Sequence, residues 1–86
     1  MSYLIRQKLL RVIEKTIDYV SSQTMNEYRK VLAVLLSDKI PNIRLLALKI
    51  VCGNKKVTDK MVENYLYKLK DDPDSEIKQI MKGVKV

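Results

Sequence analysis

The sequence predicts an all-α protein, and three features of its 86 residues support this class. Apolar residues recur every three or four positions in five segments, which is the spacing of one face of an α-helix. Glycine and proline occur only twice each, and phenylalanine and tryptophan are absent, whereas β-rich folds use more turn residues and aromatics. Hydrophobic residues form 47% and charged residues 31% of the chain, a balance typical of a folded helical domain. We therefore expect about five helices.

The first two helices are expected at residues 3 to about 20 and about 25 to 37. The apolar face of the first consists of Leu4, Ile5, Leu9, Val12, Ile13, Ile17 and Val20. The apolar face of the second consists of Tyr28, Val31, Leu32, Leu35 and Leu36. We expect Thr24 to cap the second helix, because Glu27 follows at the spacing of a capping box.

The third helix is expected from Pro41 to about residue 52. Pro41 suits the first helical position, because its fixed φ is helical and its missing N–H loses no hydrogen bond there. The apolar stripe of this helix consists of Ile43, Leu46, Ala47 and Ile50. We expect Gly53 and Asn54 to end the helix, since either residue can adopt the left-handed conformation found past many helix ends.

The last two helices are expected from about Thr58 to Lys70 and over residues 73 to 82. Thr58 is the predicted cap of the fourth helix. Its apolar face consists of Met61, Val62, Tyr65, Leu66 and Leu69. Asp72 and Pro73 predict the start of the fifth helix, with a carboxylate cap before a proline in the first helical position. The apolar residues of that helix are Ile77, Ile80 and Met81.

An internal repeat relates these helices to one another. Ile43 and Arg44 match Ile77 and Lys78 at an offset of 34 residues. Ile5 and Arg6 match Ile43 and Arg44 at an offset of 38 residues. The chain is therefore expected to form one domain, residues 1–86, in which a lone second helix precedes two helix pairs. The three parts cover residues 3–22, 24–53 and 57–83.

The helix pairs resemble HEAT repeats, whose turn holds an aspartate and often a proline, and whose second helix opens with a hydrophobic residue followed by Arg or Lys. The matching residues are Asp38, Pro41, Ile43, Arg44 and Ala47, and then Asp72, Pro73, Ile77 and Lys78. The resemblance implies a short right-handed α-solenoid of antiparallel helix pairs, as a piece of a longer solenoid. It also implies a structural ladder between neighbouring turns, formed by Asp38, Arg44, Asp72 and Lys78.

Within this family, the stretch from Asp38 onward is most similar to the last repeats of the scaffold (regulatory) subunits of type 2A serine/threonine protein phosphatases. A P-N-x-R helix, a longer linker and a final D-x-D helix follow in the same order. This resemblance implies a non-enzymatic scaffold that holds a phosphatase catalytic subunit through the turns within its repeats. The corresponding partner-binding residues are Lys39, Ile40, Asn42, Lys70, Asp71 and Asp74. Ile40 is either a contact residue or a hydrophobic staple on its own helix.

We expect no catalytic, cofactor or metal site. Arg44 stays protonated, so it cannot act as the base of an acid–base pair with Asp38. Histidine is absent, so Cys52 has no partner for a Cys–His nucleophile or a zinc site, and we expect it to be buried on an apolar stripe. The acidic residues from Asp71 to Glu76 lack the spacing of an EF-hand and are interpreted as helix-cap chemistry.

The net charge of +7 leaves an alternative open, a basic HEAT-like module that binds nucleic acid. The basic residues are scattered without a block of five, which favours a protein partner. Only Tyr67, beside Lys68 and Lys70, suggests a tyrosine that stacks on a base. A plain helical bundle acting as an adaptor is a third hypothesis.

Two further expectations concern assembly and location. The first helix lacks a partner helix, so its residues Leu4, Ile5 and Leu9 are expected to mediate dimerisation through exposed apolar surface. A single cysteine, together with the lack of a secretory signal or a long apolar run, favours the cytoplasm or the nucleus and excludes a membrane-embedded chain.

Overall fold

A computed structural model describes residues 2–84, and this segment is all-helical, without a strand. Its five α-helices are α1 (Tyr3–Thr16), α2 (Ser22–Leu35), α3 (Pro41–Gly53), α4 (Lys60–Lys68) and α5 (Ser75–Met81). Two short 3₁₀-helices flank α4, namely η1 (Lys55–Val57) and η2 (Leu69–Asp71). The predicted all-α class and the five helices are confirmed. No helix in the described segment is long and apolar enough to cross a bilayer.

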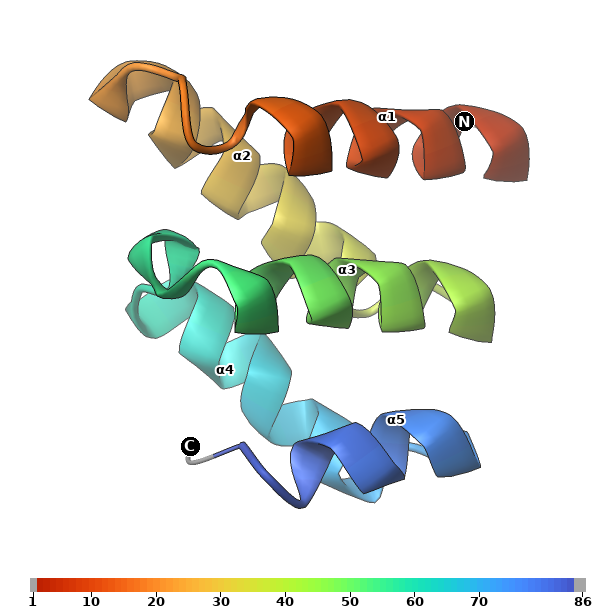
Figure 1. Cartoon of the computed structure of the whole chain (residues 1–86). Helices are drawn as coiled ribbons and strands as arrows, with labels where there is room; N and C mark the ends of the chain where they lie inside the picture. Colours follow the sequence, from red (N-terminus) through yellow and green to blue (C-terminus); the bar gives the residue numbers. More distant parts are fainter. Residues whose placement is uncertain (1, 85–86) are drawn as a thin grey trace.

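The helices lie in two layers (Figure 1). In the front layer, α1, α3 and α5 run in the same direction and lie one below another, while α2 and α4 cross behind them. α3 contacts both α1 and α5, and α2 contacts α4. The Cα atoms extend over 34 × 29 × 17 Å, a thickness that fits two helix layers spaced at about 10 Å. Helices that are separated by a whole helix in sequence are thus neighbours in space.

The core lies between the two layers, and α3 is its central element. The buried residues of α3 are Ile43, Ala47, Leu48, Ile50 and Val51. This set is wider than the single stripe expected from the sequence, because α3 has α1 on one side, α5 on the other and α2 behind it. Leu46, expected in the stripe, is only partly buried.

The apolar faces expected for α2 and α5 are confirmed, and that of α4 is confirmed except for Met61, which is 37% exposed. The buried residues of these faces are Leu32, Leu35 and Leu36 in and after α2, Val62, Leu66 and Leu69 in and after α4, and Ile77 and Met81 in α5. Tyr28, Tyr65 and Ile80 are partly buried and pack against this core.

α1 buries only one side of its wide apolar face. Leu10 and Ile13 are fully buried, whereas Ile5 and Val12 are 55% and 54% exposed. Leu10 was not part of the expected face and is a miss of the sequence interpretation. In Figure 1 no described helix lies above α1, on the side away from α3.

The boundary between α1 and α2 differs from the prediction. α1 ends at Thr16, short of residue 20, and α2 starts at Ser22. Ser21 caps α2, because its side chain accepts a hydrogen bond from the N–H of Thr24 at 3.2 Å. The predicted Thr24 cap is therefore wrong. Ser21 is an equally good cap residue, and starting there adds a helical turn that packs Met25 against the core.

The end of α3 also differs from the prediction. Gly53 is the last helical residue, and no residue in the described segment has a positive φ. The side-chain amide of Asn54 donates to the carbonyl oxygen of Ile50 at 3.2 Å, and its backbone N–H donates to that of Val51 at 3.2 Å. The helix end is thus satisfied by an asparagine side chain instead of a left-handed turn.

The starts of α4 and α5 lie one and two residues beyond the predicted positions. Asp59, not Thr58, caps α4 by accepting from the N–H of Val62 at 2.9 Å. Asp74, not Asp72, caps α5 by accepting from the N–H of Ile77 at 3.0 Å. At α4 the cap is the aspartate that follows Thr58 directly. At α5 the carboxylate of Asp72 is engaged in other contacts, which are described below.

Candidate interaction surface

A chain of charged side chains connects the two turns that lead into α3 and α5. Arg6 of α1 reaches Asp38, with 2.7 Å between Nε and Oδ1. Arg44 of α3 reaches Asp72, with Nε and Nη2 donating to the two carboxylate oxygens at 2.8 and 3.0 Å. All four side chains are at most 13% exposed. We call these four residues the Arg–Asp ladder.

Each ladder aspartate also shapes its own turn. Asp38 accepts from the N–H of Ile40, and Asp72 accepts from the N–H of Asp74, both at 2.9 Å. This bond from a carboxylate to the N–H two residues later is an Asx turn, which fixes the backbone before the helix. Arg44 further donates from Nη1 to the carbonyl oxygen of Asp38 at 2.8 Å, so one guanidinium joins both turns.

The ladder sets the charge state of Asp72. Burial of this carboxyl alone would raise its pKa, because a buried charge loses hydration. Hydrogen bonds from Arg44 and from the N–H of Asp74, with the positive charges of Arg44 and Lys78, outweigh burial and lower the pKa below its ordinary value. The ionised form of Asp72 is therefore the one that the fold stabilises.

The expected ladder positions are only partly connected. Asp38, Arg44 and Asp72 are brought together, and Arg6, which was not among the predicted ladder residues, completes the first rung. The signal for Arg6 was present in the sequence, because Ile5–Arg6 aligns with Ile43–Arg44 in the internal repeat. Lys78 occupies the next ladder position, but its side chain is exposed and forms no ion pair within residues 2–84; only its positive charge acts on Asp72.

The residues predicted to bind a partner lie at the two turns that Figure 1 shows at the right-hand end of the front layer. Lys39, Asn42, Lys70 and Asp71 are exposed. Asp74 is half-buried, and its carboxylate is engaged in capping α5.

Two of these positions make contacts that bear on their role. Ile40 is half-buried against the core, which supports the packing interpretation over a free contact residue. The ammonium group of Lys70 lies 5.0 Å from the ring centre of Tyr67, and Lys68 lies 5.1 Å from that of Tyr65. The basic and aromatic side chains of this segment are thus arranged in cation–π pairs.

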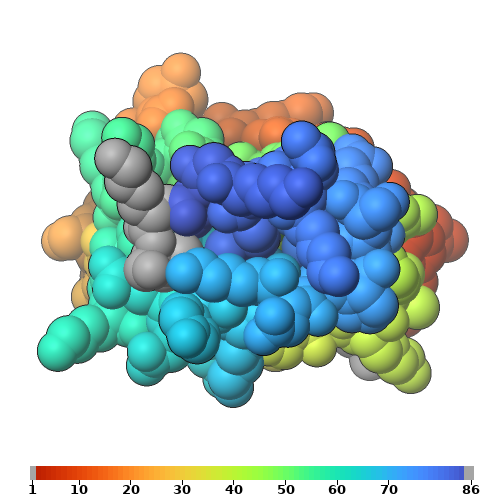
Figure 2. Space-filling model, turned by 90° about the horizontal axis from the view of Figure 1, so that it is seen from below, coloured from red at the N-terminus to blue at the C-terminus, as the bar shows by residue number. Residues whose placement is uncertain are grey.

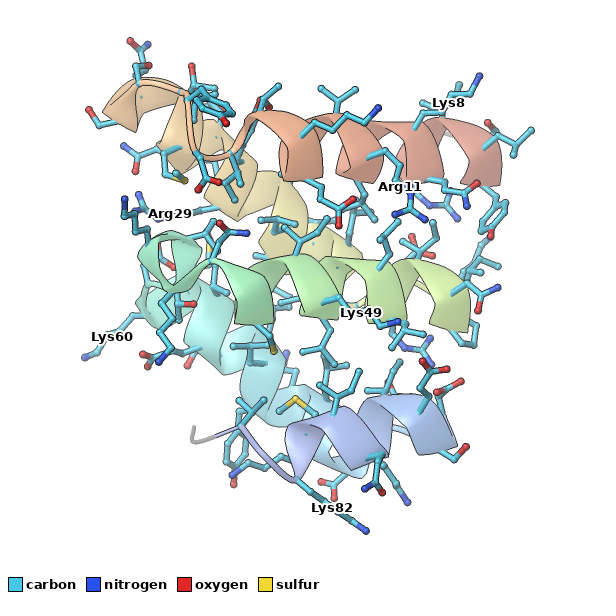
Figure 3. All side chains as sticks on the ribbon, in the orientation of Figure 1. Lys8, Arg11, Arg29, Lys49, Lys60 and Lys82 are labelled. Atoms are coloured by element: carbon cyan, nitrogen blue, oxygen red, sulfur yellow. The ribbon has the colours of Figure 1, made fainter. Side chains whose placement is uncertain are left out.

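The other basic side chains are distributed over both layers (Figure 3). Arg11 of α1 pairs with Glu14 at 3.3 Å, and Lys49 of α3 pairs with Glu76 at 3.5 Å. Arg29 lies on a different side and donates to the carbonyl oxygen of Lys56 at 2.8 Å. Each of these three basic side chains is thus engaged by a carboxylate or carbonyl oxygen.

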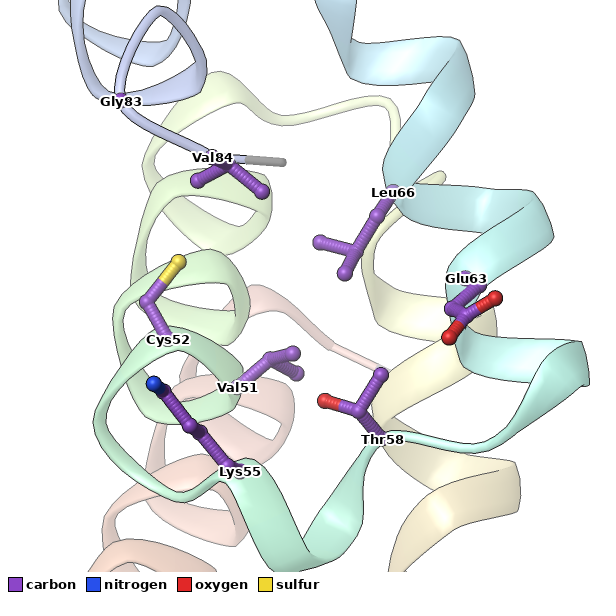
Figure 4. Close-up of a pocket in the computed structure, with 8 residues that line it drawn as sticks. All are labelled: Val51, Cys52, Lys55, Thr58, Glu63, Leu66, Gly83 and Val84. Carbon is purple, nitrogen blue, oxygen red and sulfur yellow. The ribbon is translucent and has the colours of Figure 1, made fainter. Parts of the chain in front are cut away.

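Cys52 is exposed, which contradicts the predicted burial. It lies in the last turn of α3, and it borders a groove of about 700 Å³ between α3 and α4 (Figure 4). The groove is lined by Val51, Cys52, Lys55, Thr58, Glu63, Leu66, Gly83 and Val84. Partial burial raises the pKa of the Cys52 thiol, so it stays protonated at neutral pH and is a poor nucleophile.

No group of three or more cysteine, aspartate or glutamate side chains within residues 2–84 is placed to hold a metal ion. Comparisons with protein-family models, with curated proteins and with solved structures found no match.

Proposed function

We propose that this protein is a non-catalytic HEAT-like scaffold that binds another protein. The observation that carries the proposal is the Arg–Asp ladder, in which the same contact occurs between successive helices of the front layer. A contact that repeats with the sequence period is typical of helical-repeat arrays, where each unit packs only on its neighbours. A plain helical bundle has no reason to repeat it.

The side chains with acid–base potential support a non-catalytic role. Asp38 and Asp72 are each occupied by an arginine and a backbone N–H, so neither carboxylate is available to a substrate. The thiol of Cys52 has a raised pKa and no histidine to activate it.

The binding surface in this proposal is the edge formed by the two turns. The Asx turns and the ladder hold the backbone of both turns in place, so the exposed Lys39, Asn42, Lys70 and Asp71 are presented from a rigid support. A pre-ordered surface loses less entropy on binding than a flexible loop. The resemblance to phosphatase scaffold subunits nominates a type 2A phosphatase catalytic subunit as the partner.

The proposal is tested by affinity capture from nuclease-treated lysate at physiological salt, read by mass spectrometry. We expect capture of a phosphatase catalytic subunit by the wild type, and weaker capture by Lys39→Glu and Lys70→Glu. Lys60→Glu is the matched control, because Lys60 is equally exposed but lies at the opposite end of α4. Circular dichroism verifies that each variant keeps its helicity.

Two outcomes would reject parts of this proposal. If Lys39→Glu and Lys70→Glu capture the partner as well as the wild type, the turn edge is not the binding surface. If only ribosomal or chromatin proteins are captured, and a modest increase in salt releases them, the alternative of a nucleic-acid-binding module is favoured, since counterion release makes such binding steeply salt-dependent.

A further inference from the structure

The lower end of the helix layers carries a recess bordered by lysines. The recess has a volume of about 450 Å³ and is lined by Lys70, Lys78, Met81, Lys82 and Val84. Figure 2 views this end of the molecule, where α5 and the last part of α4 lie side by side with the hollow between them. No acidic residue of the described segment lines it. We call this feature the cationic recess.

Lys78, which lines the cationic recess, occupies the same position of the internal repeat as the two ladder arginines. It follows Ile77 as Arg44 follows Ile43 and Arg6 follows Ile5. Arg6 and Arg44 each hold an aspartate of the next turn along the stack. Lys78 is the third basic residue of this series. Its charge acts on Asp72 of its own turn, but no later turn of the described segment supplies it with an aspartate.

In both rungs of the ladder, a buried isoleucine follows the aspartate five residues later. Asp38 stands five residues before Ile43, and Asp72 stands five residues before Ile77. Both isoleucines are buried in the core, at 1% and 0% exposure. Each rung thus combines an ion pair with a hydrophobic residue supplied by the same short segment.

We infer that the cationic recess is a docking site for an acidic turn of a partner protein, which has an aspartate followed five residues later by an aliphatic residue. The aspartate pairs with Lys78, and the aliphatic side chain packs on the apolar part of the recess, which consists of Val84 and the edge of the largely buried Met81. This inference rests on the proposed scaffold function and names the chemistry of one partner.

Charge and shape favour a protein turn over nucleic acid at this site. At the matching position of both existing rungs the basic residue binds a carboxylate that a turn supplies, which favours a protein turn over a phosphate here. The chain's net charge of +7 adds long-range attraction for an acidic partner.

The inference is tested by nuclear magnetic resonance on the isotope-labelled full chain. The probe is a capped synthetic peptide with the sequence of residues 71–77, DDPDSEI, which contains the aspartate and isoleucine at the required spacing and no basic residue. We expect amide shifts confined to the surroundings of Lys78, Met81 and Lys82. A peptide with asparagine at the position of Asp72, or with serine at that of Ile77, is expected to bind more weakly.

Protein variants separate the recess from general positive charge. Lys78→Glu is expected to raise the dissociation constant at least about tenfold, since it replaces attraction by repulsion. Lys78→Arg is expected to bind at least as well as the wild type, because arginine already fills this position in the two existing rungs. Lys60→Glu makes the same charge change far from the recess and is expected to leave the constant unchanged.

Three results would overturn the inference. These are the absence of shifts at millimolar peptide, equal losses in Lys78→Glu and Lys60→Glu, or tighter binding of oligothymidylate than of the peptide at the same residues. Since the captured partner of the proposed scaffold is measured separately, through Lys39, which does not line the recess, a failure here with that capture intact rejects only the docking site. Loss of both rejects the scaffold function as well.

Discussion

Arg44 is the residue through which both turns of the chain are joined. Its guanidinium donates to two oxygens of Asp72 and to the carbonyl oxygen of Asp38, and its side chain is 13% exposed. Arginine suits this task because its planar fork presents several donors in fixed directions. Lysine at the same position would supply a charge but not this geometry.

Replacement of Arg44 by methionine is expected to lower the free energy of unfolding by about 3 kcal/mol, because it leaves Asp72 charged and nearly buried without its partner. Urea denaturation measures this change. Arg11→Met is the control, since the Arg11–Glu14 pair is about half exposed and its loss is expected to cost no more than about 0.5 kcal/mol. Equal effects of the two substitutions would contradict a structural role for the ladder.

The lowered pKa of Asp72 predicts a specific dependence of stability on pH. A carboxyl whose folded pKa lies below its unfolded value, about 4, stabilises the fold above that value and loses the contribution as pH falls through the folded pKa. The difference in unfolding free energy between the wild type and Asp72→Asn is therefore expected to be largest at neutral pH and to shrink below about pH 4. A difference that stays constant over this range would refute the prediction.

At the level of the helices, the start sites show how local and tertiary effects compete. Sequence patterns place caps within two or three residues, since serine, threonine and aspartate all suit the position. The helices α2, α4 and α5 are capped by Ser21, Asp59 and Asp74. The predicted caps were Thr24, Thr58 and Asp72. At α5 the reason is tertiary, because Asp72 is already held by Arg44 and the next available carboxylate caps the helix.

The cap of α2 is open to a direct test. Ser21→Ala is expected to lower the unfolding free energy by about 1 kcal/mol, because the N–H of Thr24 loses its acceptor. Thr24→Ala removes the residue that sequence reasoning favoured and is expected to change the unfolding free energy by less than about 0.5 kcal/mol. Thermal denaturation followed by circular dichroism compares the two, and the reverse order would restore Thr24 as the cap.

For the molecule as a whole, the two ends of the front layer differ in character. The α1 end exposes Leu4, Ile5 and Val12, whereas the α5 end carries the cationic recess. Stacked helix layers leave such ends open, because the flank of the last helix at each end has no neighbour. An exposed apolar row of this kind is a site for association.

We expect self-association through the exposed side of α1. The double variant Ile5→Glu, Val12→Glu is expected to shift the protein toward the monomer in sedimentation equilibrium, without loss of helicity, because both side chains are more than half exposed. Val34→Glu is the control, since Val34 is 63% exposed on α2, in the other layer. A wild type that is monomeric at every concentration would exclude this dimer.

The fold class and the helix count followed from local information. Helical spacing of apolar residues and the scarcity of glycine and proline are properties of short segments, and such segments form helices wherever they pack. The candidate turn edge followed from the internal repeat, which aligned Asp38 with Asp72 and Arg44 with Lys78. Composition and spacing thus predicted the five helices and most of the core, whereas three of the four ladder residues were implied by the resemblance to HEAT repeats.

The remaining features, namely the burial of particular side chains and the ion pairs of the ladder, were decided by the tertiary arrangement, because they depend on which helices are neighbours. Leu48 is buried because α3 has neighbours on several sides, and Cys52 is exposed because the last turn of α3 borders an open groove. Arg6 enters the ladder across 32 residues of sequence, and Lys78 remains outside it because no turn follows within the described segment. Periodicity in sequence tells which side of a helix is apolar, whereas burial and ion pairing require the position of its neighbours.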